Sequence, residues 1–133
     1  MQVGQVRRLT RVFTLVAVAA LAVSAMAVAG LASPLGKAAS PKIVKVKDDF
    51  YKPDKVRVKK RGKVRWKWTD GLQEVHNVTL LKGPSGVKKS KFRSQTTSSP
   101  DYRFTKRFKK VGKYKFYCTI HPDVMRMKVV VHR

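Results

Sequence analysis

The single cysteine of the chain stands among residues whose side chains bind metals. In the segment "YCTIHPDVM", Cys118 is followed three positions later by His121 and then, four positions on, by Met125. A second imidazole is available upstream, at His76. Two nitrogens and two sulfurs suit copper, because thiolate and thioether favour Cu(I), imidazole serves both oxidation states, and His₂Cys with a weak axial methionine is an electron-transfer geometry. These residues predict a site for one copper ion that alternates between Cu(I) and Cu(II).

The residues around these ligands read as β-strands. Apolar and charged residues alternate with a period of two, and frequent turn sequences such as "TDG" and "KGPSG" separate the alternating segments. Seven strands are predicted: Lys42–Lys47, Lys55–Lys59, Lys63–Trp68, His76–Leu81, Tyr102–Phe108, Lys113–Cys118 and Lys128–Val131. Seven short strands indicate an all-β fold, an antiparallel Greek-key β-sandwich. Between Lys82 and Asp101, we expect Phe92 to anchor a short edge strand.

The strand that ends at Cys118 predicts where the thiol points. Counting back by two places Phe116 and Tyr114 on the same, buried face as Cys118, while Lys115 and Tyr117 face outward. Because His76 begins a strand of its own, a sandwich can bring it to the end where Cys118 lies. By the same alternation, Trp66 and Trp68 are predicted to be packing residues.

The N-terminal residues indicate export. Arg7, Arg8 and Arg11 precede the apolar run of residues 12–32, which is 21 residues long. This pattern fits a signal peptide, and its length also fits an uncleaved membrane anchor. The arginine pair leaves both the general secretory and the twin-arginine routes open. We therefore expect a signal or anchor at 1–32, a flexible spacer at 33–41, one domain at 42–133, and a periplasmic, cell-envelope or extracellular location.

The charge of the exported part is strongly positive. Of 31 basic residues, three lie in residues 1–11, which leaves 28 against 7 acidic residues, about +21. Such a field attracts anionic partners and weakens with salt. We expect a redox protein with an acidic surface as partner, with an anionic membrane or envelope polymer as a further candidate, no specific nucleic acid, and a monomer.

Four segments, "FYKPDKVRVKKRGKVRWKW", "HNV", "YKFYCTIHP" and "MRMKVVV", resemble the small blue (type 1) copper proteins, the cupredoxins, and most of all the plastocyanin, amicyanin and pseudoazurin group. The resemblance covers residues 42–131. It implies that His76 and His121 are ligands together with Cys118, that His121 is the partly exposed ligand through which electrons pass, and that Asn77 ties the strand of His76 to the cysteine loop.

The axial ligand departs from that pattern. Cys-x-x-His-x-x-x-Met is one residue longer than the amicyanin-like loop and one shorter than the plastocyanin-like loop, and Met127 occupies a position that is often glycine. We assign the axial role to Met125, because it stands three residues before Lys128 as the axial methionine of the family does. Met127 is the alternative.

The predicted function is that of an exported one-electron carrier and not of an enzyme. Asp70, Glu74 and Asp123 are too scattered for acid–base catalysis and read as turn residues. Cys118 and His121 do not match a protease pattern, and zinc seldom takes methionine. His132 reads as an exposed tail residue. Two other functions stay open: copper storage or delivery, and a basic module that binds anions.

Overall fold

The computed structural model describes residues 39–133. The predicted signal or anchor at 1–32 and residues 33–38 of the predicted spacer lie outside the described residues. The described part contains eight strands and one short 3-10 turn: β1 (Lys42–Lys47), β2 (Phe50–Lys52), β3 (Lys55–Lys59), β4 (Lys63–Trp68), β5 (Thr79–Lys82), η1 (Lys89–Phe92), β6 (Arg103–Arg107), β7 (Gly112–Tyr117) and β8 (Arg126–His132). Within residues 39–133, no helix has the length and apolar character needed to cross a membrane.

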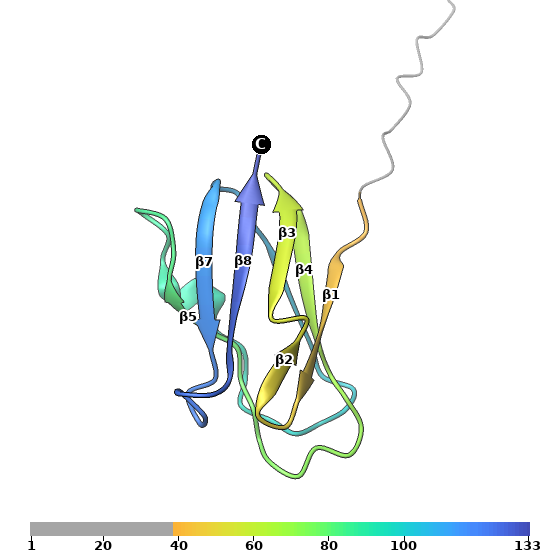
Figure 1. The fold of residues 1–133 in the computed structure, drawn as a ribbon. Coiled ribbons are helices and arrows are strands. Elements are labelled where there is room, and N and C mark those ends of the chain that lie inside the picture. The colour runs from red at the N-terminus through yellow and green to blue at the C-terminus, as the bar shows by residue number, and fades with distance from the viewer. Residues whose placement is uncertain (1–38) are drawn as a thin grey trace, which may run out of the picture. The chain divides into compact units, whose positions relative to one another are not determined.

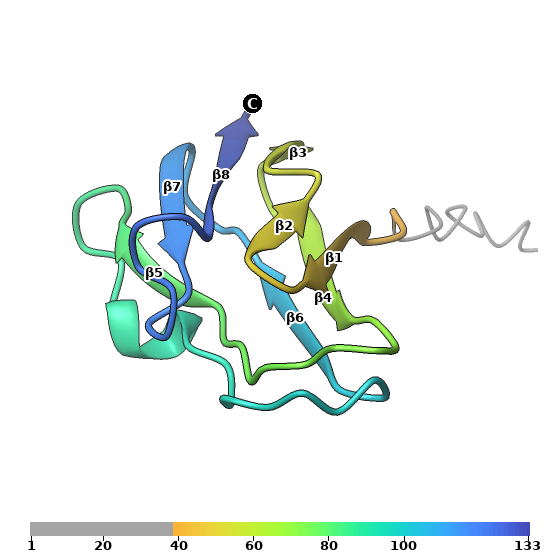
Figure 2. The same cartoon turned by 60° about the horizontal axis from the view of Figure 1, so that its bottom comes forward.

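The strands form two four-stranded sheets, with the orders β2-β1-β4-β6 and β3-β8-β7-β5 (Figures 1 and 2). The predicted all-β sandwich is thus confirmed, with one correction: the sheets are mixed. β1 runs parallel to β4 and β3 runs parallel to β8, while the other pairs are antiparallel. A period-two pattern cannot reveal strand direction, because parallel and antiparallel strands expose alternate residues alike.

The alternation places the strands well. Three predicted ranges, those of β1, β3 and β4, agree with the structure residue for residue, and β6, β7 and β8 shift by one or two residues. The short strand β2, which buries Tyr51, was not predicted, because the sequence there reads as a turn. The edge strand expected around Phe92 is wrong: η1 occupies that place, and Phe92 packs against Phe108 and Tyr114.

Aromatic side chains hold the two sheets together. Trp66 of β4 is fully buried and contacts Phe104 of its own sheet and Phe116 of the other, with ring centroids 5.6 and 5.2 Å apart. Trp68 is also buried, as predicted, and packs edge-on against Tyr102 at 4.8 Å. Burial of one such side chain contributes roughly 3 kcal/mol. The core lies wholly within residues 44–131, and residues 39–133 belong to one compact unit with its own core.

The two loops that carry the predicted ligands, between β4 and β5 and between β7 and β8, lie at one end of the sandwich, the lower end in Figure 1. The turn between β1 and β2 and the part of the β5–β6 connection that leads into β6 lie at the same end. We call this the site end. The chain enters β1 at the opposite end, where Lys42 pairs with Val64, and His132 lies at that far end beside Lys59. The prediction that His132 is an exposed tail residue is wrong, because His132 is the last residue of β8.

Candidate metal centre

The structure brings three predicted ligands together. One donor atom each from His76, Cys118 and His121 lies within 4.8 Å of the others. His76 and Cys118 are fully buried, and 17% of the His121 side chain is exposed. The two imidazole rings lie with their centroids 5.0 Å apart. Cys118 and His121 belong to one loop, whereas His76 comes from a segment more than 40 residues earlier, so the fold brings His76 to the other two donors.

Backbone pairing fixes His76 before β5 begins. His76 donates its N–H to the carbonyl of Thr97 at 3.0 Å and accepts one from Thr97 at 3.0 Å, which forms an isolated β-bridge. The indole of Trp68 also donates to the His76 carbonyl at 3.3 Å. The strand predicted to begin at His76 begins at Thr79 in the structure. His76 lies outside β5 but still makes a pair of backbone hydrogen bonds of the kind that strand residues make.

Asn77 joins the His76 segment to the cysteine loop. Its backbone N–H points at the Cys118 sulfur, 3.4 Å away, and its side-chain oxygen accepts the backbone N–H of Thr119 at 3.1 Å. Its amide nitrogen donates to the hydroxyls of Thr119 and Thr96, at 2.6 and 3.0 Å. The geometry therefore agrees with the brace that the family resemblance implies for Asn77.

The loop from Cys118 to Met125 closes on itself. Met125 donates its N–H to the carbonyl of His121 at 3.1 Å, and Cys118 donates to the carbonyl of Met125 at 3.0 Å. The loop is short because β7 and β8 are an antiparallel pair whose last partners are Tyr117 and Arg126. Cys118 and Met125 are consequently neighbours across the end of this pair.

A carboxylate holds one nitrogen of each histidine ring. Nε2 of His76 lies 2.8 Å from Oδ1 of Asp48, and Nε2 of His121 lies 2.5 Å from Oε2 of Glu74 and 3.6 Å from Oδ1 of Asp49. The Nδ1 atoms of both rings are buried and have no hydrogen-bond partner. A buried nitrogen without a partner is costly. This arrangement leaves the two Nδ1 atoms as free donors for a metal ion.

The turn between β1 and β2 supplies two of these carboxylates. Asp49 has a φ of +66°, in the left-handed region that aspartate tolerates better than most residues. The turn directs Asp48 to His76 and Asp49 to His121. The hydrogen bond from His76 lowers the pKa of Asp48, and backbone N–H groups of Gln73 and Glu74 add to the effect. Asp48 is therefore a stable anionic partner for the ring N–H.

The two candidate axial methionines occupy different places. Both are buried, and both face inward because they alternate with Arg126 and Lys128. Met127 lies opposite Phe116, one step deeper than the site, and its sulfur accepts the indole N–H of Trp66 at 3.0 Å. Met125 lies beside Cys118 at the site end. Of the two thioethers, that of Met127 is thus already engaged within the core.

The donor set fits a copper ion. A buried thiol and two imidazole Nδ1 atoms without partners supply three donors of the types that copper prefers, and the buried Met125 is joined to Cys118 by a backbone hydrogen bond. The carboxylates that hold Nε2 are the outer partners that metal-binding histidines commonly have. Tyr51 adds a neutral hydrogen bond behind the site: burial raises the pKa of its hydroxyl, which donates to the Asn77 carbonyl.

Sequence reasoning missed the two carboxylates. The sequence patterns single out neither Asp48 nor Asp49, and they indicate a turn residue at Glu74. A signal existed in the doublet Asp48–Asp49, because the chain has only 7 acidic residues and these are the only adjacent pair. What the sequence did not reveal is that contacts over 28 and 47 residues bring Asp48 and Glu74 onto the two histidines.

Comparison with known structures gives the same picture. Amicyanin from Paracoccus versutus is 30% identical, with 71% of this chain and 83% of that chain covered and a TM-score of 0.57. An amicyanin variant, solved in its reduced Cu(I) form at pH 4, is 26% identical over 71% of this chain and 85% of its own, with a TM-score of 0.58. A purple cupredoxin from Nitrosopumilus maritimus shares the fold at 24% identity, covering 68% of this chain and 98% of its own, with a TM-score of 0.55. No curated protein sequence matches the chain.

A sequence profile settles the family. The profile described as copper binding proteins, plastocyanin/azurin family, matches residues 42–132, which include both sheets and every donor described above. The match covers most of the chain, and the solved amicyanins share its fold. The chain belongs to the plastocyanin/azurin family of copper-binding proteins, and its cofactor is copper.

Proposed function

We propose that this protein is an exported one-electron carrier whose copper ion is held by His76, Cys118 and His121, with Met125 as the axial ligand. The observation that carries the proposal is the pair of buried Nδ1 atoms without partners beside a buried thiol, each ring being fixed at Nε2 by a carboxylate. When bound, copper supplies a centre that accepts and releases one electron.

The residues of the chain keep the donors in place while the charge of the site changes. Asn77 locks the cysteine loop, the Thr97 bridge locks His76, and the backbone bonds within the loop lock His121 and Met125. Because these restraints come from the folded sandwich, the donors do not have to move between the two oxidation states. Small rearrangement favours fast electron transfer.

The burial of the donors favours a carrier over a protein that delivers copper. Delivery requires the recipient's ligands to reach the ion, whereas His76, Cys118 and Met125 are fully buried. Of these donors His121 alone reaches the surface, and exposed apolar side chains lie on the adjoining loops, at Val75, Ile120 and Val124, and at Phe50, where β2 begins. We infer that a redox partner contacts this apolar end close to His121.

The acidic residues of the site end restrict where an acidic partner can bind. Six of the seven acidic residues lie on its loops: Asp48, Asp49, Asp70, Glu74, Asp101 and Asp123. An acidic surface on the partner must therefore face the lysines and arginines of the strands behind the loops. Long-range attraction by the basic body would then speed the encounter, and salt would slow it.

A spectrum tests the function. Purified protein loaded with Cu(II) is expected to bind one copper ion, to absorb intensely in the visible region, and to bleach and recover reversibly as a reductant and then an oxidant are added. Rapid loss of Cu(I) to a soluble chelator, without such a cycle, would identify a delivery protein instead. Failure to take up copper would leave the basic, anion-binding module. The variant His132→Ala, which alters a histidine at the far end, serves as the matched control and should retain the spectrum.

A further inference from the structure

Each sheet carries on its outer face a row of four basic residues, which are paired with one another across its four strands. In the first sheet Lys52, Lys45, Lys67 and Arg103 lie side by side across β2, β1, β4 and β6. In the second sheet Lys55, Lys128, Lys115 and Lys82 do so across β3, β8, β7 and β5. With strands about 4.8 Å apart, each row is about 14 Å long.

The two rows join around one edge of the sandwich. Lys52 ends β2 and Lys55 begins β3, and only Pro53 and Asp54 lie between them. Since β2 belongs to one sheet and β3 to the other, the connection carries the series of cations from one face to the opposite face (Figure 1). We call these eight residues the cationic belt.

The cationic belt is an unfavourable arrangement for the protein alone. Like charges directly opposite each other on neighbouring strands destabilise a sheet. In residues 39–133, Arg126 is the one lysine or arginine that forms an ion pair with a carboxylate, Asp123 at 3.7 Å, and it is not in the belt. Lysines on edge strands protect a sheet from aggregation, but β1, β4, β7 and β8 are central strands. The rows therefore need another explanation.

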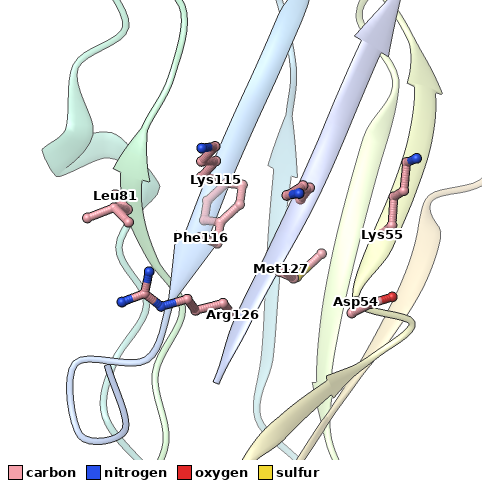
Figure 3. Close-up of a pocket in the computed structure, with 8 residues that line it drawn as sticks. Asp54, Lys55, Leu81, Lys115, Phe116, Arg126 and Met127 are labelled. Carbon is pink, nitrogen blue, oxygen red and sulfur yellow. The ribbon is translucent and has the colours of Figure 1, made fainter. Parts of the chain in front are cut away.

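Part of the second row borders a cleft in the sheet surface, shown in Figure 3. Lys55, Lys115 and Lys128 line it, and Arg126 adds its guanidinium group on the side of the site end. Asp54 is the one carboxylate there. Four cations around one depression form a favourable place for anionic groups.

We propose that the cationic belt binds a flexible linear polyanion, a glycan or polyol polymer that carries carboxylate or phosphodiester groups and no bases. The polymer crosses the strands of one sheet, turns at the β2–β3 edge and follows the row on the other sheet. This track leaves His121 and the apolar residues of the site end uncovered. The protein is thereby held in an anionic matrix while its site end stays open to a partner.

The geometry separates this ligand from two other anionic surfaces. A lipid bilayer is flat, so it contacts one sheet face at a time and leaves the opposite row without a ligand. Single-stranded nucleic acid binds by stacking its bases on exposed aromatic rings. Here Trp66, Trp68, Tyr114 and Phe116 are buried, and no exposed aromatic residue other than Phe50 is found in the described residues.

The test compares charge removal on the two faces. The copper-loaded unit of residues 39–133 is titrated into fluorescently labelled poly(glycerol phosphate) and, separately, polygalacturonate, and anisotropy is followed over a range of salt concentrations. The variants are Lys115→Thr with Lys128→Thr for one row, and Lys45→Thr with Lys67→Thr for the other. Lys60→Thr with Lys109→Thr removes the same charge from exposed turns outside the belt. Visible absorption verifies that each variant is folded.

For the native unit, a plot of log K against log salt should have a slope of about −6, by analogy with single-stranded polyanions that contact eight cations. Each row variant is expected to bind the polymers about tenfold more weakly and to reduce the slope by about 1, whereas the turn variant changes affinity less than twofold. Without polymer, both row variants should melt at a higher temperature than the native unit at low salt, because opposed like charges are removed. The phosphodiester and carboxylate polymers distinguish the two sources of negative charge.

Three results would overturn the proposal. If the turn variant weakens binding as much as the row variants do, net charge and not the belt is responsible. If only one row matters, the ligand is a flat surface, and vesicles with 30% anionic lipid should then compete with the polymers. If oligo(dT) of matched charge binds more tightly than the base-free polymers, the surface is a nucleic-acid site.

Discussion

The site end and the outer sheet faces treat charge in opposite ways. At the site end, two of the chain's few carboxylates are each committed to an imidazole nitrogen, Asp48 to His76 and Glu74 to His121. On the sheet faces, rows of lysines lie directly opposite one another and make no ion pairs with carboxylates in the part of the chain that the structure describes.

This contrast indicates two separate demands on one small domain. The site end needs exact placement of a few donors, which hydrogen bonds and burial provide. The faces need a continuous positive surface, which repetition provides at some cost in stability. Because the sandwich core already fixes the backbone, both demands are met on the same strands.

Replacing the thiol should have the largest effect. Cys118→Ser removes the soft donor, so the intense visible absorption of the Cu(II) protein should disappear entirely, while the thermal unfolding of the copper-free protein changes little. Absorption and calorimetry measure the two effects. A variant that keeps the colour would remove Cys118 from the proposed ligand set.

Truncation of the brace should be the next largest. Asn77→Ala breaks the bonds to Thr119 and Thr96 and leaves buried polar groups without partners. We expect unfolding of the copper-free protein in urea to lose about 3 kcal/mol of free energy. Gln95→Ala, which alters an exposed side chain on a neighbouring loop, should change it by less than about 0.5 kcal/mol. Equal losses in the two variants would contradict the role of Asn77.

Substitution of Met125 should change mainly the reduction potential, and substitution of Met127 should change mainly the free energy of unfolding. Met125→Leu removes the proposed axial sulfur and should shift the reduction potential, because the axial ligand tunes the potential of such a site, while copper stays bound. Met127→Leu deprives the indole N–H of Trp66 of its acceptor and should cost about 1 to 2 kcal/mol of stability with little change in potential. Voltammetry and urea unfolding read out both variants, and the reverse pattern would move the axial role to Met127.

The alternation of apolar and charged residues explains which strands could be predicted from the sequence and which could not. Three strands, β1, β3 and β4, were placed to the residue because their alternation is strict. The alternation does not reveal β2, because a strand of three residues before Pro53 is too short to show a period, and a period of two does not reveal strand direction. Residue type and order are enough to select His76, Cys118 and His121 as candidate ligands. The contacts of the two histidines with Asp48 and Glu74 depend on how distant loops meet, which the local sequence does not reveal.

The smallest predicted effect tests whether the site-end carboxylates act by contact or by charge alone. Glu74→Gln keeps an acceptor beside His121 but removes a negative charge, so it should raise the reduction potential, because a negative charge favours the more positive Cu(II). The rise should be modest and should shrink as salt is added, because Glu74 is mostly exposed. Asp70→Asn removes the same charge from the same loop, at a residue that makes no ion pair with a histidine within residues 39–133. Voltammetry at two salt concentrations should give a larger shift for Glu74→Gln than for Asp70→Asn. Equal shifts would mean that the site-end carboxylates act on the copper only through their overall charge.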